Sequence, residues 1–164
     1  MKMGAACALI LAAAVAGPTQ AQDGGAGWAT AIATRPSDDH KMIYRYIAEF
    51  VPGFDRRAFP ERVTLEWRYA SETGLPARPE REAMDRFEDS LGAKLRDQGR
   101  LTASLVIVST GEGVRRWTYY VKSSAVFMKD LSVVTPKSSA PIETRVATDP
   151  GWSSYETFIS GVRR

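Results

Sequence analysis

Between Arg62 and Leu95, the apolar positions first alternate and then recur at helical spacing. Every second position of the first stretch is apolar: Val63, Leu65, Trp67 and Tyr69. This period of two predicts a strand over 62–69 with one buried face. Further along, the apolar positions recur three and four apart: Met84, Phe87, Leu91 and Leu95. That spacing predicts an amphipathic helix that begins at Pro79. Such a helix must lie on the sheet to be stable.

Similar patterns predict the other elements on both sides of this unit. Prolines, glycines and short polar runs separate them, and a turn over 35–40 joins the first two strands. The glycines at 110–113 favour a hairpin turn. The expected elements, in chain order, are strands over 28–34, 42–49, 101–109 and 115–122, a helix from Ser123 or Ser124 to Leu131, and a strand over 142–147.

A final helix is expected after residue 148. Asp149 has the side chain preferred at an N-cap, and Pro150 would occupy the first helical position, where its missing N–H costs nothing. The apolar residues that would share one face of this helix are Trp152, Tyr155, Phe158 and Ile159.

The order of elements from 62 to 147 is strand, helix, strand, strand, helix, strand. This order is typical of the split βαβ, or ferredoxin-like, arrangement. The predicted fold class is therefore α+β, with an antiparallel sheet that an N-terminal hairpin extends. The last helix would close an edge or an end of the sheet.

The N-terminus has the pattern of a secretory signal. Lys2 precedes an apolar run over 4–17, and the small-residue segment 19–21 offers a cleavage site after Ala21. The expected organisation is a signal peptide over 1–21, a flexible lead-in over 22–27 and one domain over 28–164. The mature protein would be periplasmic or secreted, without stable membrane insertion after cleavage.

Removing this segment changes which chemistry is available. Cys7, the one cysteine, would be lost, and with it any disulfide or cysteine metal site. Lys2 is the only charged residue before Gln22, so the formal charge falls from +3 to +2. Such a small excess does not indicate a nucleic-acid partner.

Residue types that could perform catalysis do not converge in the sequence. His40 is the only histidine, and its neighbours Asp38 and Asp39 are typical of a turn. The acidic residues over 80–89 are expected on the solvated face and first turn of a helix. No catalytic residue, metal site or cofactor is predicted.

The surface of most interest is the sheet face opposite the alternating apolar positions. It would present a mixed-charge set of binding candidates: Glu66, Arg68, Arg116, Tyr120 and Arg145, accompanied by Thr118 and Glu143. Ferredoxin-like sheets bind RNA through aromatic residues on such a face, but Tyr120 is the one aromatic candidate here. The alternative is cross-strand ion pairing on a wet surface.

Several motifs resemble a known family when they are taken together. They lie at 43–46, 63–69, 74–76, 87–89, 110–111, 116–120, 141–143 and 149–155. The chain resembles the bacterial family called domain of unknown function 695 across nearly all of the predicted domain. Its C-terminal part is also similar to protein inhibitors of ribonuclease E, which share an Asp-Pro-x-Trp-x-x-Tyr pattern and a ferredoxin-like fold. The first resemblance implies a fold and no activity.

The sequence thus predicts an exported, non-catalytic binding or protein-interaction module, with a protein partner in the cell envelope. One alternative is an inhibitor or regulator of an enzyme, like the ribonuclease E inhibitors. Another is an enzyme with an unrecognised site, which a pocket gathering Glu66, Arg68, Arg116 or His40 would favour.

Overall fold

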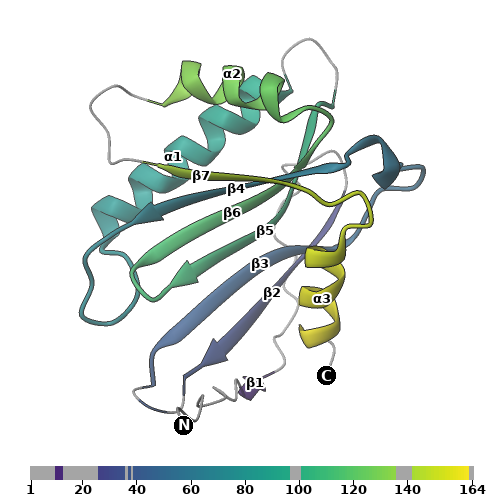
Figure 1. Ribbon diagram of the computed structural model, residues 1–164. Coiled ribbons are helices and arrows are strands. Elements are labelled where there is room, and N and C mark those ends of the chain that lie inside the picture. Colours follow the sequence, from purple (N-terminus) through teal and green to yellow (C-terminus); the bar gives the residue numbers. More distant parts are fainter. Residues whose placement is uncertain are drawn as a thin grey trace, which may run out of the picture.

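A computed structural model describes residues 10–12, 26–35, 37, 39–96, 101–135 and 142–162 (Figure 1). The described strands form one antiparallel sheet in the order β1-β2-β3-β5-β6-β4-β7. Their bounds are β1 (Ile10–Ala12), β2 (Gly27–Thr34), β3 (Lys41–Glu49), β4 (Glu61–Arg68), β5 (Ala103–Gly111), β6 (Val114–Val121) and β7 (Glu143–Thr148). The helices are α1 (Arg78–Leu95), α2 (Ser124–Val134) and α3 (Ser153–Val162), with a short 3-10 turn η1 (Arg56–Ala58).

The predicted α+β class and ferredoxin-like core are confirmed. The chain runs β4-α1-β5-β6-α2-β7, and these strands lie side by side as β5-β6-β4-β7. The predicted N-terminal hairpin is β2–β3, and it extends the sheet because β3 pairs with β5. The sheet therefore continues well beyond the ferredoxin-like core on the β5 side.

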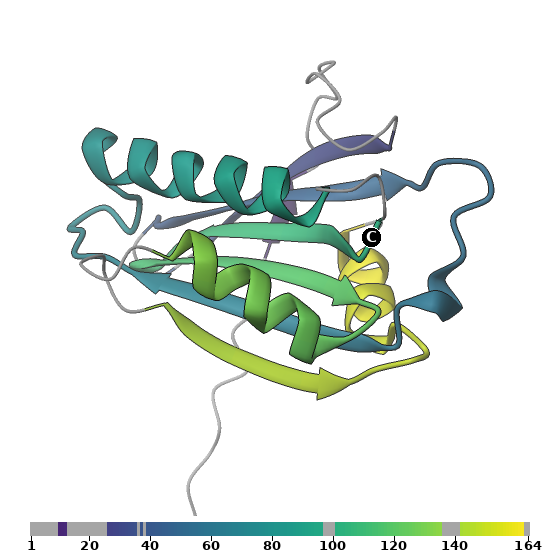
Figure 2. The same cartoon turned by 90° about the horizontal axis from the view of Figure 1, so that it is seen from above.

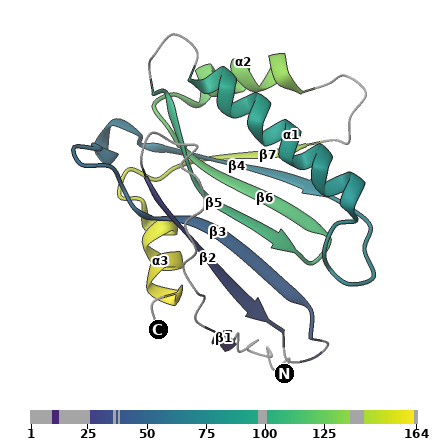
Figure 3. The same cartoon turned by 180° about the vertical axis from the view of Figure 1, so that it is seen from behind.

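Helices lie on both faces of this sheet. In Figure 3, α1 crosses in front of the strands with α2 beside it, whereas Figure 1 shows α3 on the opposite face. Figure 2 gives the same arrangement from above. The alternating residues of β4 pack against α1 as predicted, in a core cluster that includes Val63, Leu65, Trp67, Met84, Phe87, Leu91, Trp117 and Phe127.

The start of α3 differs from the prediction. The helix begins at Ser153, and Pro150 lies in the preceding turn. Trp152 adopts a left-handed backbone with φ of 56°, which reverses the chain just before the helix. Asp149 nevertheless caps the helix, because its carboxylate accepts hydrogen bonds from the backbone N–H groups of Ser153 (2.8 Å) and Ser154 (3.1 Å).

The acidic residues of α1 are only partly a solvated face, which corrects another expectation. Glu88 accepts a hydrogen bond from the Trp117 indole at 2.8 Å and forms an ion pair with Arg45. Asp85 pairs with the buried Arg115. These carboxylates tie α1 to the sheet because the indole and guanidinium donors beneath it need acceptors.

Several predictions concern residues outside the described part of the chain. They include most of the expected signal peptide (1–9 and 13–21) and most of the lead-in (22–25). Two further segments lie outside the described part: residues 97–99, where a glycine favours a helix end, and most of a Pro/Ser-rich stretch (136–141) that favours a link between elements. Within the described residues, no helix combines the length and apolar character needed to cross a membrane.

Candidate binding face

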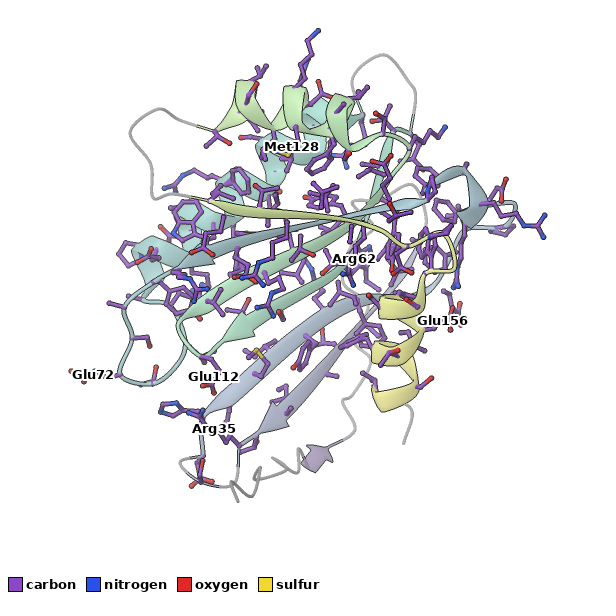
Figure 4. The ribbon with its side chains drawn as sticks, in the orientation of Figure 1. Arg35, Arg62, Glu72, Glu112, Met128 and Glu156 are labelled. Atoms are coloured by element: carbon purple, nitrogen blue, oxygen red, sulfur yellow. The ribbon has the colours of Figure 1, made fainter. Side chains whose placement is uncertain are left out.

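The sheet face opposite α1 and α2 is covered at one end. There α3 packs on the sheet through a largely aromatic hydrophobic cluster that contains Phe59, Tyr120, Trp152, Tyr155 and Ile159. Figure 4 shows Arg62 and Glu156 at this end, whereas Glu112 and Arg35 lie at the far end by the hairpin turns. We call the part of this face formed by Thr64, Glu66, Arg68, Arg116, Thr118, Glu143 and Arg145 the open face.

Strand register brings the predicted polar residues of the open face together. Glu66 of β4 lies opposite Arg116 of β6 on one side and opposite Glu143 of β7 on the other. Thr64, two residues earlier, lies opposite Thr118 and Arg145. Because side chains two residues apart share a face, one continuous polar surface spans three adjacent strands.

Glu66 is the centre of this surface and is buried, not exposed as expected. Only 1% of the residue is accessible. Its Oε1 lies 2.8 Å from Nε and from Nη2 of Arg116, and its Oε2 lies 3.2 Å from Nη2 of Arg68. The aliphatic stems and guanidinium groups above it keep water away, and the charge stays paired.

The arginines around Glu66 remain accessible. The exposed fraction of the side chain is 61% for Arg68, 66% for Arg145 and 42% for Arg116. Arg68 also donates from Nε to Glu143 at 3.0 Å, and this contact holds the pKa of Glu143 below its usual range. Arg145 is held more loosely, because its Nη2 lies 3.7 Å from Glu66 and 4.0 Å from Glu143.

Tyr120, the remaining predicted binding residue, is not on the accessible surface. It is fully buried, and its ring stacks on Trp152 with the centroids 3.9 Å apart. Its hydroxyl donates to Asp149 at 2.6 Å. Burial, and then the hydrogen bond to Asp149, raise the pKa of this phenol above its usual value. The expected exposure of Tyr120 was wrong, because the alternation of β6 does not reveal that α3 covers this end of the strand.

Tyr44, an aromatic residue outside the predicted binding set, lies beside the open face. Tyr44 of β3 pairs in register with Ser109, which in turn pairs with Arg116. Its ring lies 5.2 Å from that of Phe158 on α3, and burial raises the pKa of its hydroxyl. Tyr44 and Tyr46 are two residues apart in β3 and share a face, and this spacing could have indicated the position, provided that the pairing of β3 with β5 was known.

The other candidates for chemistry lie apart from the open face. His40 is in the turn between β2 and β3, where its Nδ1 lies 3.1 Å from Nη2 of Arg35. Arg35 forms an ion pair with Glu112 of the neighbouring turn at 2.7 Å. Asp38 lies outside the described residues. Across the ranges that the structure describes, no group of three or more metal-ligating side chains occurs.

The chemistry of the open face suits binding. Arginine stays protonated and offers five donors in a planar fork that matches carboxylate and phosphate oxygens. Both oxygens of Glu66 accept hydrogen bonds from Arg68 and Arg116, so Glu66 serves to position these arginines. The arrangement can therefore recognise an anionic group, and it lacks the nucleophile–base geometry that covalent catalysis requires.

Comparison with known protein families identifies a similarity over most of the chain. The sequence model of DUF695, described as a family of unknown function, matches residues 28–160. Neither the curated proteins nor the solved structures contain a match to this chain.

Proposed function

The chain belongs to the family of unknown function DUF695, and from its own geometry we propose that it is a non-catalytic binding module for a protein partner. The observation that carries this proposal is the uncovered part of the sheet. α3 protects only one end of the face, whereas Arg68, Arg116 and Arg145 remain accessible around a buried carboxylate.

A flat set of arginines fits a protein surface better than a small metabolite. Arginine is enriched at protein interfaces because its fork gives directional hydrogen bonds and its stem packs on apolar atoms. In the open face, the three arginines come from three adjacent strands, and hydrogen bonds to Glu66 hold the guanidinium groups of Arg68 and Arg116 in place. Such pre-organised side chains lose little conformational freedom when a partner binds.

We place this module in the periplasm or outside the cell. Lys2, the apolar run over 4–17 and the small residues at 19–21 support export with cleavage after Ala21. Mass measurement of the protein purified from its native host tests this directly. A mass that corresponds to a start at Gln22 is expected, and an intact Met1 in the mature protein would contradict it.

The binding proposal is tested with variants of the open face. The full chain and its triple variant R68Q/R116Q/R145Q would serve as baits in extracts of the native cell envelope. We expect a stoichiometric partner that the triple variant fails to retain. R78Q is the matched control, because Arg78 lies on α1 with its side chain 82% exposed.

Comparing the partners that the three baits retain either supports or contradicts the proposal. A partner that the wild type and R78Q retain equally, and that the triple variant loses, supports the proposal. Equal retention by all three proteins would place the contact elsewhere. Circular dichroism and thermal melting of each variant confirm that lost binding does not reflect lost folding.

The similarity to ribonuclease E inhibitors raises a second candidate function, and one observation limits how it would work. In the shared C-terminal pattern, Trp152 is 1% and Tyr155 2% exposed. The hydroxyl of Tyr155 donates to the carbonyl of Ile47 at 2.6 Å, and Asp149 caps α3. These residues hold α3 on the sheet, so an inhibitor of this kind would have to dock through other residues.

A further inference from the structure

We infer that the open face recognises carboxylates of an extended acidic segment in its protein partner, which deepens and rests on the proposed function. The inference starts from unused hydrogen-bond donors. Arg68 uses Nε and Nη2, and Arg116 uses Nε and Nη2, in their contacts with Glu66 and Glu143. Among the described residues, the Nη1 groups of these two side chains donate no hydrogen bond.

Arg145 has more unused hydrogen-bond donors than Arg68 or Arg116. Its distances to Glu66 and Glu143, 3.7 Å and 4.0 Å, exceed hydrogen-bond length. Its guanidinium group is therefore held near the cluster by charge and is available for a bidentate contact with a ligand carboxylate. At 66% exposure it can reorient without breaking a hydrogen bond.

Charge balance favours an anion of low charge density. Three arginines face two carboxylates in the cluster, so one positive charge remains. The side chain of Glu143 is 49% exposed and would repel a doubly charged phosphate more than a single carboxylate. A nucleic acid needs a broad basic patch to neutralise many phosphates, and the mixed charges here do not form one.

The spacing of the arginines suggests how the acidic residues are arranged. Arg116, Arg68 and Arg145 come from the adjacent strands β6, β4 and β7. Arg116 lies opposite Glu66 and Arg145 lies opposite Thr64, two residues along, which places Arg116 and Arg145 about 12 Å apart at the backbone. Alternate side chains of an extended segment are about 7 Å apart. Two acidic residues at alternate positions, together with flexible arginine stems, span this distance.

More than one such contact is needed for measurable affinity. A single exposed ion pair contributes little in water, about 1 kcal/mol or less. Several charge-assisted hydrogen bonds from pre-organised arginines act together, and the buried Glu66 supplies that pre-organisation. The inference therefore concerns a segment with repeated acidic residues, not a lone aspartate or glutamate.

The test is a titration of the full chain with a hexapeptide of alternating serine and glutamate, followed by NMR or calorimetry. We expect binding that weakens with salt and is about tenfold weaker for R68Q/R145Q. R145Q alone should weaken it as well, and this variant disturbs no hydrogen bond of the fold. R78Q should bind as the wild type does.

Three further probes decide whether the carboxylate is what is recognised. A serine–glutamine peptide should not bind, and neither inorganic phosphate nor an oligothymidylate should bind more tightly than the acidic peptide. The inference is overturned if the acidic peptide fails to bind, if the neutral peptide binds equally, or if R78Q weakens binding as much as R145Q. If partner capture still depends on the open face while the acidic peptide fails, only this inference falls and the proposed function stands.

Discussion

At the scale of single residues, one carboxylate organises the attachment of α3. Asp149 accepts from the hydroxyl groups of Tyr120 (2.6 Å) and Ser153 (2.8 Å), as well as from two backbone N–H groups at the start of the helix. Burial by itself raises the pKa of Asp149, but these hydrogen bonds outweigh it and hold the pKa well below the ordinary value of 3.8.

This depressed pKa predicts a specific dependence of stability on pH. The carboxylate is more acidic in the folded than in the unfolded chain, so its stabilisation is present above pH 3.8 and is lost as the pH falls below that value. D149N should lower the free energy of unfolding by about 2 kcal/mol near neutral pH, since neutral hydrogen bonds replace charged ones.

Urea unfolding of the wild type and D149N between pH 2 and 7 checks this prediction. The difference in the free energy of unfolding between the two proteins should shrink below about pH 4, because there the carboxylate takes up a proton in the unfolded chain while it stays ionised in the folded one. If the difference in the free energy of unfolding stays constant down to pH 2, Asp149 has the same pKa in the folded and the unfolded chain, which would contradict the prediction.

At the scale of elements, the attachment of the β2–β3 hairpin to the core depends on the end of β5. Gly111 has φ of 158°, and a Cβ atom there would lie 2.6 Å from the carbonyl oxygen of Lys41 and 2.9 Å from the sulfur of Met42. The following turn has positive φ at both Glu112 (54°) and Gly113 (71°), as a type I′ hairpin requires.

Replacing Gly111 should therefore loosen β3 from β5. We expect G111A to lower the free energy of unfolding by about 2 kcal/mol, since an added carbon must displace backbone. Chemical denaturation followed by tryptophan fluorescence measures the effect. G161A is the control: nothing lies within 4 Å of its Cβ position in α3, so unchanged or slightly higher stability is expected. Equal stability of G111A and G161A would contradict the close approach of Lys41 and Met42 to Gly111.

At the scale of the whole molecule, local patterns predicted the fold better than the candidate site. The alternation in β4 and the helical spacing to Leu95 depend on nearby residues, and both were correct. The exposure of Tyr120 and Glu66 depends on distant partners. Tyr120 is covered by Trp152, which lies in the segment before α3. Glu66 is covered by Arg68 of its own strand and by Arg116 and Arg145 of the two neighbouring strands.

The same reason explains the misplaced start of α3. Asp149 and Pro150 satisfy the local rules for a helix start, and the sequence contains no sign that the chain first makes a turn through Trp152. That turn is favoured by tertiary packing, since the Trp152 indole donates to the carbonyls of Arg56 and Phe59, both at 3.1 Å. Long-range contacts of this kind cannot be read from short-range periodicity.

The central claim is that the open face is where a partner binds, and site-specific photocrosslinking tests it most directly. A photoreactive residue would replace Thr118, which lies on β6 two residues from Arg116 and opposite Thr64 of β4. Ser90, exposed on α1, provides the matched control position. In cells of the native host, we predict one discrete protein adduct from position 118 and none from position 90. An adduct from position 90 alone would contradict the account, because it would place the partner on the helical side of the molecule.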